Sequence, residues 1–252
     1  MIAKQRSFHS HMTRAVSHAM YGVCIAFTVF IVSLLIIVTG YLLSLGFSSL
    51  SWAFFTELPT GDPSNPGGMR HAIIGTAILI SIASAIGIPL GMLAGIFLSE
   101  YDVNSWLAPK VRFVADVLAG VPSIVVGILG YELLVVPLGG YNGWAGAAAL
   151  AFIMIPIVAR TTEEMLRLVP NSYREASMAL GATKASTILF VVIPAATGSV
   201  VTGIMLAIAR VAGETAPLLF TALGSRLLTL DPSQPFPSLT VQIYNYATGP
   251  YT

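Results

Sequence analysis

Long apolar runs separated by short polar segments are the dominant pattern of this chain. Five runs occupy residues 19–47, 72–99, 113–138, 144–160 and 188–223. A helix needs about 20 predominantly apolar residues to cross the hydrocarbon core of a bilayer. The pattern therefore predicts an all-α membrane protein with five transmembrane helices in this chain.

The composition agrees with a lipid-facing surface. The chain has 252 residues, of which 56% are hydrophobic and 9% are charged, whereas soluble domains carry about 25% charged residues. A net charge of +1 excludes a strongly basic surface for nucleic acid. The single cysteine, Cys24, excludes a disulfide framework.

The positions of the basic residues predict the orientation of the chain. Only Arg70 and Arg226 follow the first, third or fifth run, and the other segments hold Lys4, Arg6, Arg14, Lys110, Arg112, Arg160, Arg167, Arg174 and Lys184. Because basic residues concentrate on the cytoplasmic side, we expect a cytoplasmic tail over 1–18. A transmembrane domain over 19–223 then includes a cytoplasmic loop at 161–187, and the polar tail 224–252 is external.

Three glycines in the second run indicate a close helix contact. Gly87, Gly91 and Gly95 recur at four-residue spacing, and small residues let membrane helices approach closely. The alternative is that glycine is simply frequent in membrane helices.

The cytoplasmic loop predicts a short surface helix. The segment TTEEMLRLVP extends the fourth run as an amphipathic helix, with Glu163 on its polar side. Ser172 and Glu175 have the spacing of a capping box, which predicts a helix over 173–180, and Gly181 ends it. Such a helix suits docking into a groove of a partner, although an ordinary surface connector has the same pattern.

Several strings resemble a known family. The sequence Glu175-Ala176-Ser177, followed by Gly181 and then Ile193-Pro194, resembles the EAA loop of ABC importer permeases, with Ser177 where a second alanine is usual. The strings GVPSIVVG (120–127) and ARVAGETAP (209–217) are similar to the phosphate permeases. The second string looks most like the A-type of the two phosphate permease subunits.

The resemblance implies a type I ABC importer permease fold, with a sixth transmembrane helix after the polar tail. It implies a pore-forming subunit of an ATP-driven importer of inorganic phosphate, multi-pass in the bacterial cytoplasmic (inner) membrane with a cytoplasmic N-terminus. The implied partners are a second homologous permease, two ATP-binding subunits, an external phosphate-binding protein and membrane lipid, with no nucleic acid, cofactor or metal. The residues implied in coupling to the ATPase are Arg174, Glu175, Ala176, Ser177 and Gly181.

Two charged residues inside the fifth run are candidates for the substrate pathway. Arg210 and Glu214 are spaced i, i+4 and are expected to meet on one helix face. They form either an ion pair that locks helices together, or a site where Arg210 faces a translocated oxyanion while Glu214 and Thr215 support it. In the third run Pro122 produces either a kink or a half-helix that turns its N-terminus and Ser123 toward an anion.

Two other acidic residues have simpler interpretations. Asp116 follows Arg112 by one turn, so an ion pair between them is expected, and Glu132 has no evident partner.

Competing functions lack their expected motifs. An intramembrane metalloenzyme would use H-E-x-x-H, which does not occur in the sequence. The histidines His9, His11 and His18 cluster in the N-terminal tail, where they form either a metal site or, as we expect, part of a solvated basic tail, and His71 stands alone. The chain also has no G-x-x-x-x-G-K-[ST] loop, so ATP hydrolysis by that route requires separate subunits. A secondary transporter would show inverted repeats. A permease for sulfate, molybdate or phosphonate remains the alternative within the ABC class.

Overall fold

The computed structural model describes residues 2–62, 65–101 and 106–249, with the side chains of 2–13, 15, 61–62 and 65–66 excepted. The predicted contributions of Lys4, Arg6, His9 and His11 therefore fall outside the described side chains. The chain divides into two compact units, Met1–Phe54 and Phe55–Thr252.

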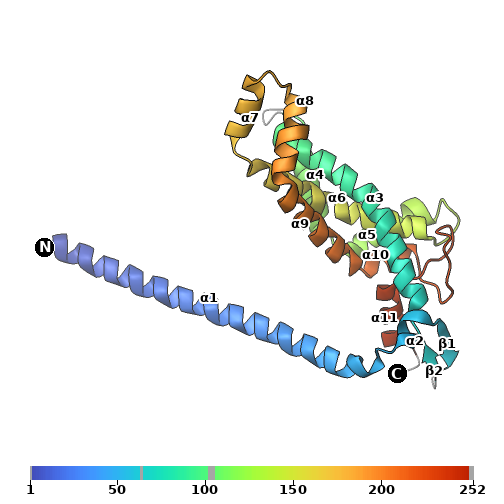
Figure 1. Cartoon of the computed structure of the whole chain (residues 1–252). Helices are drawn as coiled ribbons and strands as arrows, with labels where there is room; N and C mark the ends of the chain where they lie inside the picture. Colours follow the sequence, from blue (N-terminus) through green and yellow to red (C-terminus); the bar gives the residue numbers. More distant parts are fainter. Residues whose placement is uncertain (1, 63–64, 102–105, 250–252) are drawn as a thin grey trace. The chain divides into compact units, whose positions relative to one another are not determined.

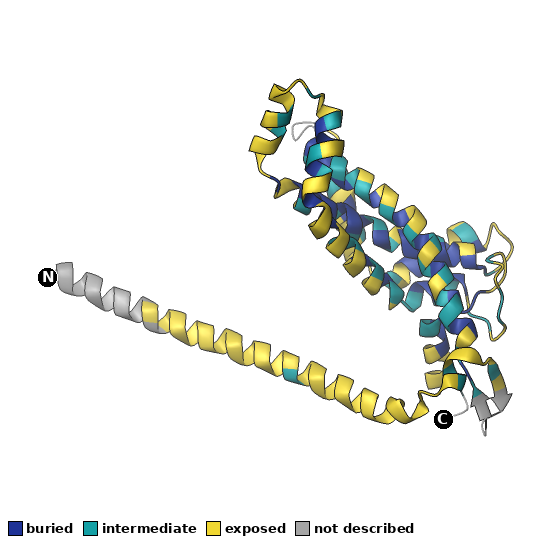
Figure 2. Cartoon of the chain, viewed as in Figure 1, coloured by how far each residue is buried: buried dark blue, intermediate teal, exposed yellow. Residues whose placement is uncertain are grey.

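The first unit is one long helix. Helix α1 (Ile2–Gly46) continues into the short 3-10 helix η1 (Phe47–Ser49). Its apolar stretch, Val16–Ser49, has no residue buried within the chain, and Figure 2 shows the described part of α1 as almost entirely exposed. A helix covered with Leu, Ile, Val and Phe needs lipid or another chain around it, as the first predicted span requires.

Helices α3 (Arg70–Glu100), α6 (Gly143–Arg167) and α9 (Ile193–Ala212) form the centre of the second unit (Figure 1). Helix α3 packs along α6, and α9 packs against both. Their apolar side chains form one core cluster that includes Leu79, Ala83, Leu150, Met154, Val158, Ala207 and Val211.

The predicted glycine contact is confirmed and joins α3 to α6. A Cβ atom built on Gly91 would lie 2.7 Å from the Cβ of Val158, and one on Gly95 would lie 2.6 Å from the carbonyl oxygen of Ala159. Gly87 faces Met154 in the same way. The absence of side chains at these positions is what permits the two helix backbones to approach.

The third predicted span is not a single helix. Helices α4 (Ala108–Gly120) and α5 (Ser123–Gly130) are separate, and the π-helical turn η2 (Tyr131–Val135) extends α5. The two halves meet at an angle of 100°. Pro122 has no amide hydrogen and forces Val121 into an extended conformation, so the half-helix alternative is the one that forms.

The fifth predicted span ends earlier than its apolar run. Helix α8 (Lys184–Thr187), the π-helical turn η3 (Ile188–Val192) and α9 are continuous, but α9 ends at Ala212 and a separate helix α10 covers Ala216–Thr221. Gly213 caps α9, and Pro217 in the first turn of α10 cannot continue a preceding helix. The wide turn η3 immediately precedes Pro194, which has no amide to pair with the carbonyl of the preceding turn.

The outer segments form small elements of their own. Helix α2 (Trp52–Thr56) precedes a two-stranded antiparallel sheet of β1 (Pro59–Asp62) and β2 (Asn65–Gly67). Helix α11 (Leu239–Thr248) is capped by Ser238 and attaches to α3, where Thr76 Oγ1 accepts from the amide of Leu239 at 2.8 Å.

The described residues contain four helices long and apolar enough to cross a membrane, and a fifth span if the bent pair counts as one. Figure 1 shows the β-strands and α11 at one end of the second unit and α7 (Asn171–Ala179) with α8 at the other. The second end carries the loop that the sequence predicts to be cytoplasmic.

The close contact of α3 and α6 predicts a strong response to a side chain at Gly91. Gly91→Val should lower the free energy of unfolding by about 1–3 kcal/mol, because overpacking displaces Val158 or the backbone of α6. The matched control is Gly198→Val on α9, where a new Cβ meets nothing within 4 Å. Thermal unfolding of the purified chain in detergent measures both, and equal stability of the two variants would contradict the contact.

Candidate functional site

The predicted surface helix is α7, but it begins differently from the prediction. Its N-cap is Pro170, and no side chain caps it. The predicted capping box of Ser172 and Glu175 is therefore wrong, because the fixed φ of Pro170 starts the helix before Ser172 and leaves both residues inside it. The predicted end is confirmed, since Gly181 has a φ of +89°, a conformation that favours glycine.

Helix α7 is exposed over most of its surface. None of its residues is buried, and Leu180, which follows the helix, is 90% exposed. Tyr173 and Met178 are 55% and 47% exposed, while Glu175 and Ala176 are exposed beside them. Exposed apolar residues grouped on a short helix outside the spans are typical of a protein interface.

Arg174 is the exception, because its side chain turns toward the bundle. Its Nη2 lies 2.6 Å from Glu100 Oε1 and its Nε lies 3.0 Å from Glu100 Oε2, a two-pronged ion pair. The same guanidinium donates to the carbonyl oxygens of Val169 at 2.7 Å and Leu166 at 2.9 Å. The hydrogen bonds to Glu100 raise the pKa of Arg174, so its charge persists at any pH of interest.

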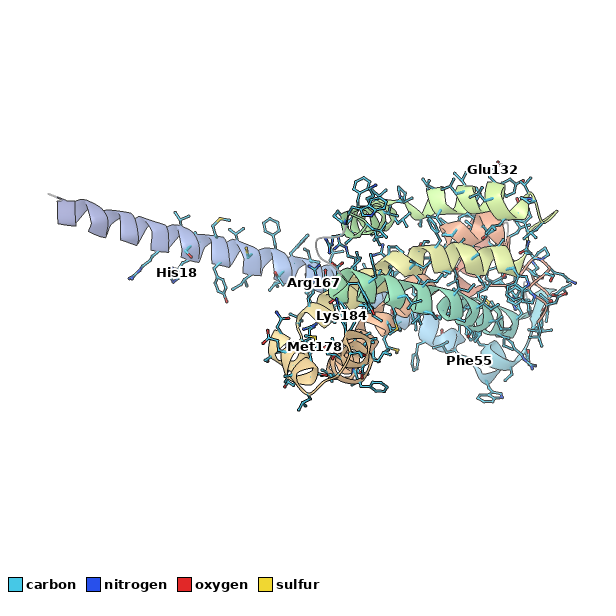
Figure 3. All side chains as sticks on the ribbon, turned by 90° about the horizontal axis from the view of Figure 1, so that it is seen from above. His18, Phe55, Glu132, Arg167, Met178 and Lys184 are labelled. Carbon is cyan, nitrogen blue, oxygen red and sulfur yellow. The ribbon has the colours of Figure 1, made fainter. Side chains whose placement is uncertain are left out.

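Two further contacts hold the loop around α7. Ser177 Oγ lies 2.9 Å from Thr187 Oγ1, which is buried at the end of α8. The ammonium of Lys184, at the start of α8, lies 5.0 Å from the centre of the Tyr101 ring, next to the end of α3. Figure 3 shows Arg167, Met178 and Lys184 at the same end of the second unit, opposite Glu132.

A second ionic cluster surrounds Glu163 on α6. Glu163 is 1% exposed, and its Oε1 lies 2.6 Å from Arg112 Nη2 of α4 and 2.8 Å from Arg167 Nη2. Arg160 Nη1 lies 3.5 Å from its Oε2 and also pairs with Asp116 of α4.

Two expectations about this cluster are wrong. Arg112 does not pair with Asp116 but with Glu163, and Glu163 is buried instead of lying on a polar surface. Helix α4 packs against α6, so the side chains of Arg112 and Asp116 reach across to α6 rather than along their own helix. The cluster joins three guanidinium groups to two carboxylates and thereby fixes α4 to α6 by charge.

The predicted pair of Arg210 and Glu214 is not formed. Arg210 is in the last turn of α9, but Glu214 lies beyond the helix end at Ala212, so the two residues do not share a helix face. Among the described residues no ion pair joins them. Arg210 is exposed on this chain, and Glu214 is half-buried, with its carbonyl oxygen accepting from Thr240 Oγ1 at 3.1 Å.

Arg210 lies on a helix whose other face is buried. Its neighbours Ala207 and Val211 belong to the core cluster shared with α3 and α6, while Arg210 itself is exposed in the last turn of α9. An exposed guanidinium on a helix apolar enough to cross a membrane requires water, an anion or a partner chain next to it.

The other predicted pathway residues lie on neighbouring short helices. Ser123 begins α5, and Thr215 immediately precedes α10. These helices pack against each other through Gly127, where a Cβ would lie 3.0 Å from the Cα of Pro217. The structure therefore brings two helix starts that are far apart in the sequence onto adjacent elements.

Glu132 is in the π-helical turn η2 and is exposed beside Leu133, which is 70% exposed. The ring of the adjacent Tyr131 lies 5.8 Å from that of Tyr141. No ion pair of Glu132 is found among the described residues.

Sequence reasoning missed Glu100 entirely. It is 8% exposed and ends the second apolar run. A carboxylate at a helix C-terminus interacts unfavourably with the helix dipole, so it needs a cation nearby. The position of Glu100 in the sequence therefore indicates that a basic partner exists, but it does not identify that partner.

Comparisons with known proteins identify the family of the chain. Residues 87–249 match the family described as "Binding-protein-dependent transport system inner membrane component". The chain is 47% identical over 206 residues to the phosphate transport system permease protein PstA of Yersinia pestis, covering 82% of this chain and 70% of that protein. It is 44% identical over 211 residues to the PstA protein of Haemophilus influenzae, covering 84% and 74%.

A solved structure shares the fold. A chain of the MetNI methionine ABC transporter in an inward-facing conformation aligns with a TM-score of 0.56 at 20% identity, covering 73% of this chain and 81% of that one. The predicted type I importer permease fold is confirmed.

The Glu163 cluster predicts a destabilised chain when its carboxylate loses its charge. Glu163→Gln should lower the free energy of unfolding by about 1–3 kcal/mol, because three arginines lose their common anion. Glu164→Gln is the matched control, since Glu164 is exposed on the same helix. Thermal unfolding in detergent should separate the two variants, and a Glu163→Gln chain as stable as the control would contradict the role assigned to the cluster.

Proposed function

Because the chain belongs to the family of binding-protein-dependent transport system inner membrane components, we propose that it is the A-type permease subunit of a phosphate ABC importer. The assignment of phosphate as the substrate rests on the 47% identity to a protein named as a phosphate transport permease. Multi-pass insertion in the inner membrane follows from the family and from the apolar helices.

The position and exposure of α7 are evidence for a role in coupling to an ATPase. It corresponds to the EAA loop of the sequence, it is exposed, and it presents Tyr173, Met178 and Leu180 outside the spans. The side chains of Glu175 and Ala176 are free to contact a partner, whereas Ser177 and Arg174 contact this chain. Since the chain has no nucleotide-binding loop, two ATP-binding subunits supply hydrolysis.

Arg210 supports a pathway for an oxyanion. Among the described residues its guanidinium has no carboxylate partner, and it is exposed on α9, a helix apolar enough to cross a membrane. An arginine in such a position offers its planar donors to a tetrahedral oxyanion. With Glu214 turned away, Arg210 keeps its full charge for the substrate, and Ser123 and Thr215 contribute hydroxyl groups from the adjacent short helices.

The complete importer contains a second homologous permease, which covers the exposed faces of α9 and α5 and closes the pathway. An external phosphate-binding protein docks on the segments 48–71 and 224–252, and the N-terminus is cytoplasmic. Closure of the ATPase dimer moves α7 and opens the cavity near Arg210 to the outside. Separation of the ATPases then releases the anion inward.

Radiolabelled phosphate uptake into vesicles that carry the full complex tests this function. Arg210→Gln should reduce ATP-dependent uptake by roughly tenfold or more, equivalent to about 1.4 kcal/mol, while the complex stays assembled. Arg14→Gln, at an exposed arginine of α1 outside the proposed pathway and docking surfaces, is the matched control and should transport normally.

Two outcomes would contradict the proposal. Normal uptake by Arg210→Gln would remove Arg210 from the pathway. Import of sulfate, molybdate or phosphonate, but not of phosphate, by wild-type vesicles would show that the substrate is another oxyanion.

A further inference from the structure

Three basic side chains from three different elements meet the C-terminal end of α3. Arg174 of α7 pairs with Glu100, Arg167 of α6 reaches the carbonyl oxygen of Leu98 at 3.5 Å, and Lys184 of α8 lies over Tyr101. The last carbonyl groups of a helix have no partners within it and carry partial negative charge, so cations are favoured there. The end of α3 is thus the anchor of the whole α7–α8 loop.

Arg174 connects two helix ends at once. It neutralises Glu100 at the end of α3, and it donates to the carbonyl oxygens of Leu166 and Val169 at the end of α6. The side chains of Arg174 and Glu100 are 17% and 4% exposed, so water competes little for these bonds. A planar guanidinium can make all of them together, whereas an ammonium cannot.

Apart from the contacts of Arg174, α7 packs against α8 and η3, the segments that follow it in the chain. It contains no buried residue, and the other contact described for its side chains, between Ser177 and Thr187, leads to α8. Beyond α8 lies the π-helical turn η3, a wide turn whose hydrogen bonding is less regular than that of an α-helix. The contacts of Arg174 lead instead directly to the closely packed pair of α3 and α6.

We propose that Glu100 and Arg174 form a strut that transmits the movement of α7 to the α3–α6 pair, so that both are positioning residues for energy coupling. This inference rests on the proposed function, in which α7 seats against an ATP-binding subunit. Arg174 then acts on the membrane helices and not on the ATPase, unlike the role that the family resemblance implied. Without the strut, α7 stays docked and moves with the ATPase, but the α3–α6 pair no longer follows.

The test compares ATP hydrolysis with phosphate uptake in vesicles carrying the full complex. Glu100→Gln keeps the size of the side chain and removes its charge. It should raise the ATP hydrolysed per phosphate imported by roughly tenfold, the factor that corresponds to about 1.4 kcal/mol. The ATP-binding subunits should co-purify with the variant in normal amounts.

Glu164→Gln makes the same chemical change at an exposed position and should leave the ratio unchanged. Arg174→Lys provides a second variant if Glu100→Gln does not assemble. It keeps the charge but loses the two-pronged contact, and it should also raise the ratio.

The outcomes separate the strut from the proposed function. An unchanged ratio in the assembled Glu100→Gln and Arg174→Lys complexes, with normal uptake by the wild type, would overturn the strut alone. Loss of the ATP-binding subunits from these variants would also overturn it, because it would place Arg174 in the docking surface. Absence of phosphate uptake in the wild type would instead overturn the proposed function.

Discussion

The close approach of α3 and α6 is the constraint on which the rest of the second unit depends. Gly87, Gly91 and Gly95 leave no side chain between the two backbones, so the helices run side by side as far as their ends. That contact brings Glu100 at the end of α3 next to the unpaired carbonyl groups at the end of α6. The guanidinium of Arg174 binds Glu100 and these carbonyl groups at the same time. Helix α7 is therefore held in place because the C-terminal ends of α3 and α6 lie next to each other.

Ion pairs hold the helices together at the α7 end of the second unit, as apolar packing does in its centre. Glu163 fixes α4 to α6 through Arg112, and Glu100 fixes α7 to α3 through Arg174. Both carboxylates are nearly inaccessible to water, and a buried charge is tolerated only when it is paired. Because removal of one partner leaves the other unpaired, these clusters hold the elements in a definite arrangement.

The sequence predicted the membrane class, the glycine contact and the surface helix, because each depends on a local pattern. Hydropathy shows where helices run, a four-residue glycine spacing marks one helix face, and Gly181 marks the end of α7. The sequence also indicated Pro122 as a break, although it left open whether a kink or a half-helix would form. The half-helix α5 packs against α10 at Gly127, a contact between segments far apart in the sequence that no local pattern contains.

The ion pairs were harder to predict, because partners were assigned by spacing along one helix. Arg112 and Asp116 satisfy that spacing but each bonds to α6 instead. Arg210 and Glu214 satisfy it as well, yet α9 ends at Ala212 with Gly213 as its cap, between the two residues. Glu100 and Arg174 are far apart in the sequence, and only the packing of α3 on α6 brings them together.

The strut requires that α7 and the end of α3 move as one body. Spin labels at Ser172→Cys on α7 and Leu93→Cys on α3, both exposed positions, report the distance between them once Cys24 is replaced by serine. Measured by pulsed electron spin resonance in the full complex, that distance should be the same in the nucleotide-free and ATP-bound states. A distance that changes when ATP binds would contradict a rigid link through Glu100 and Arg174.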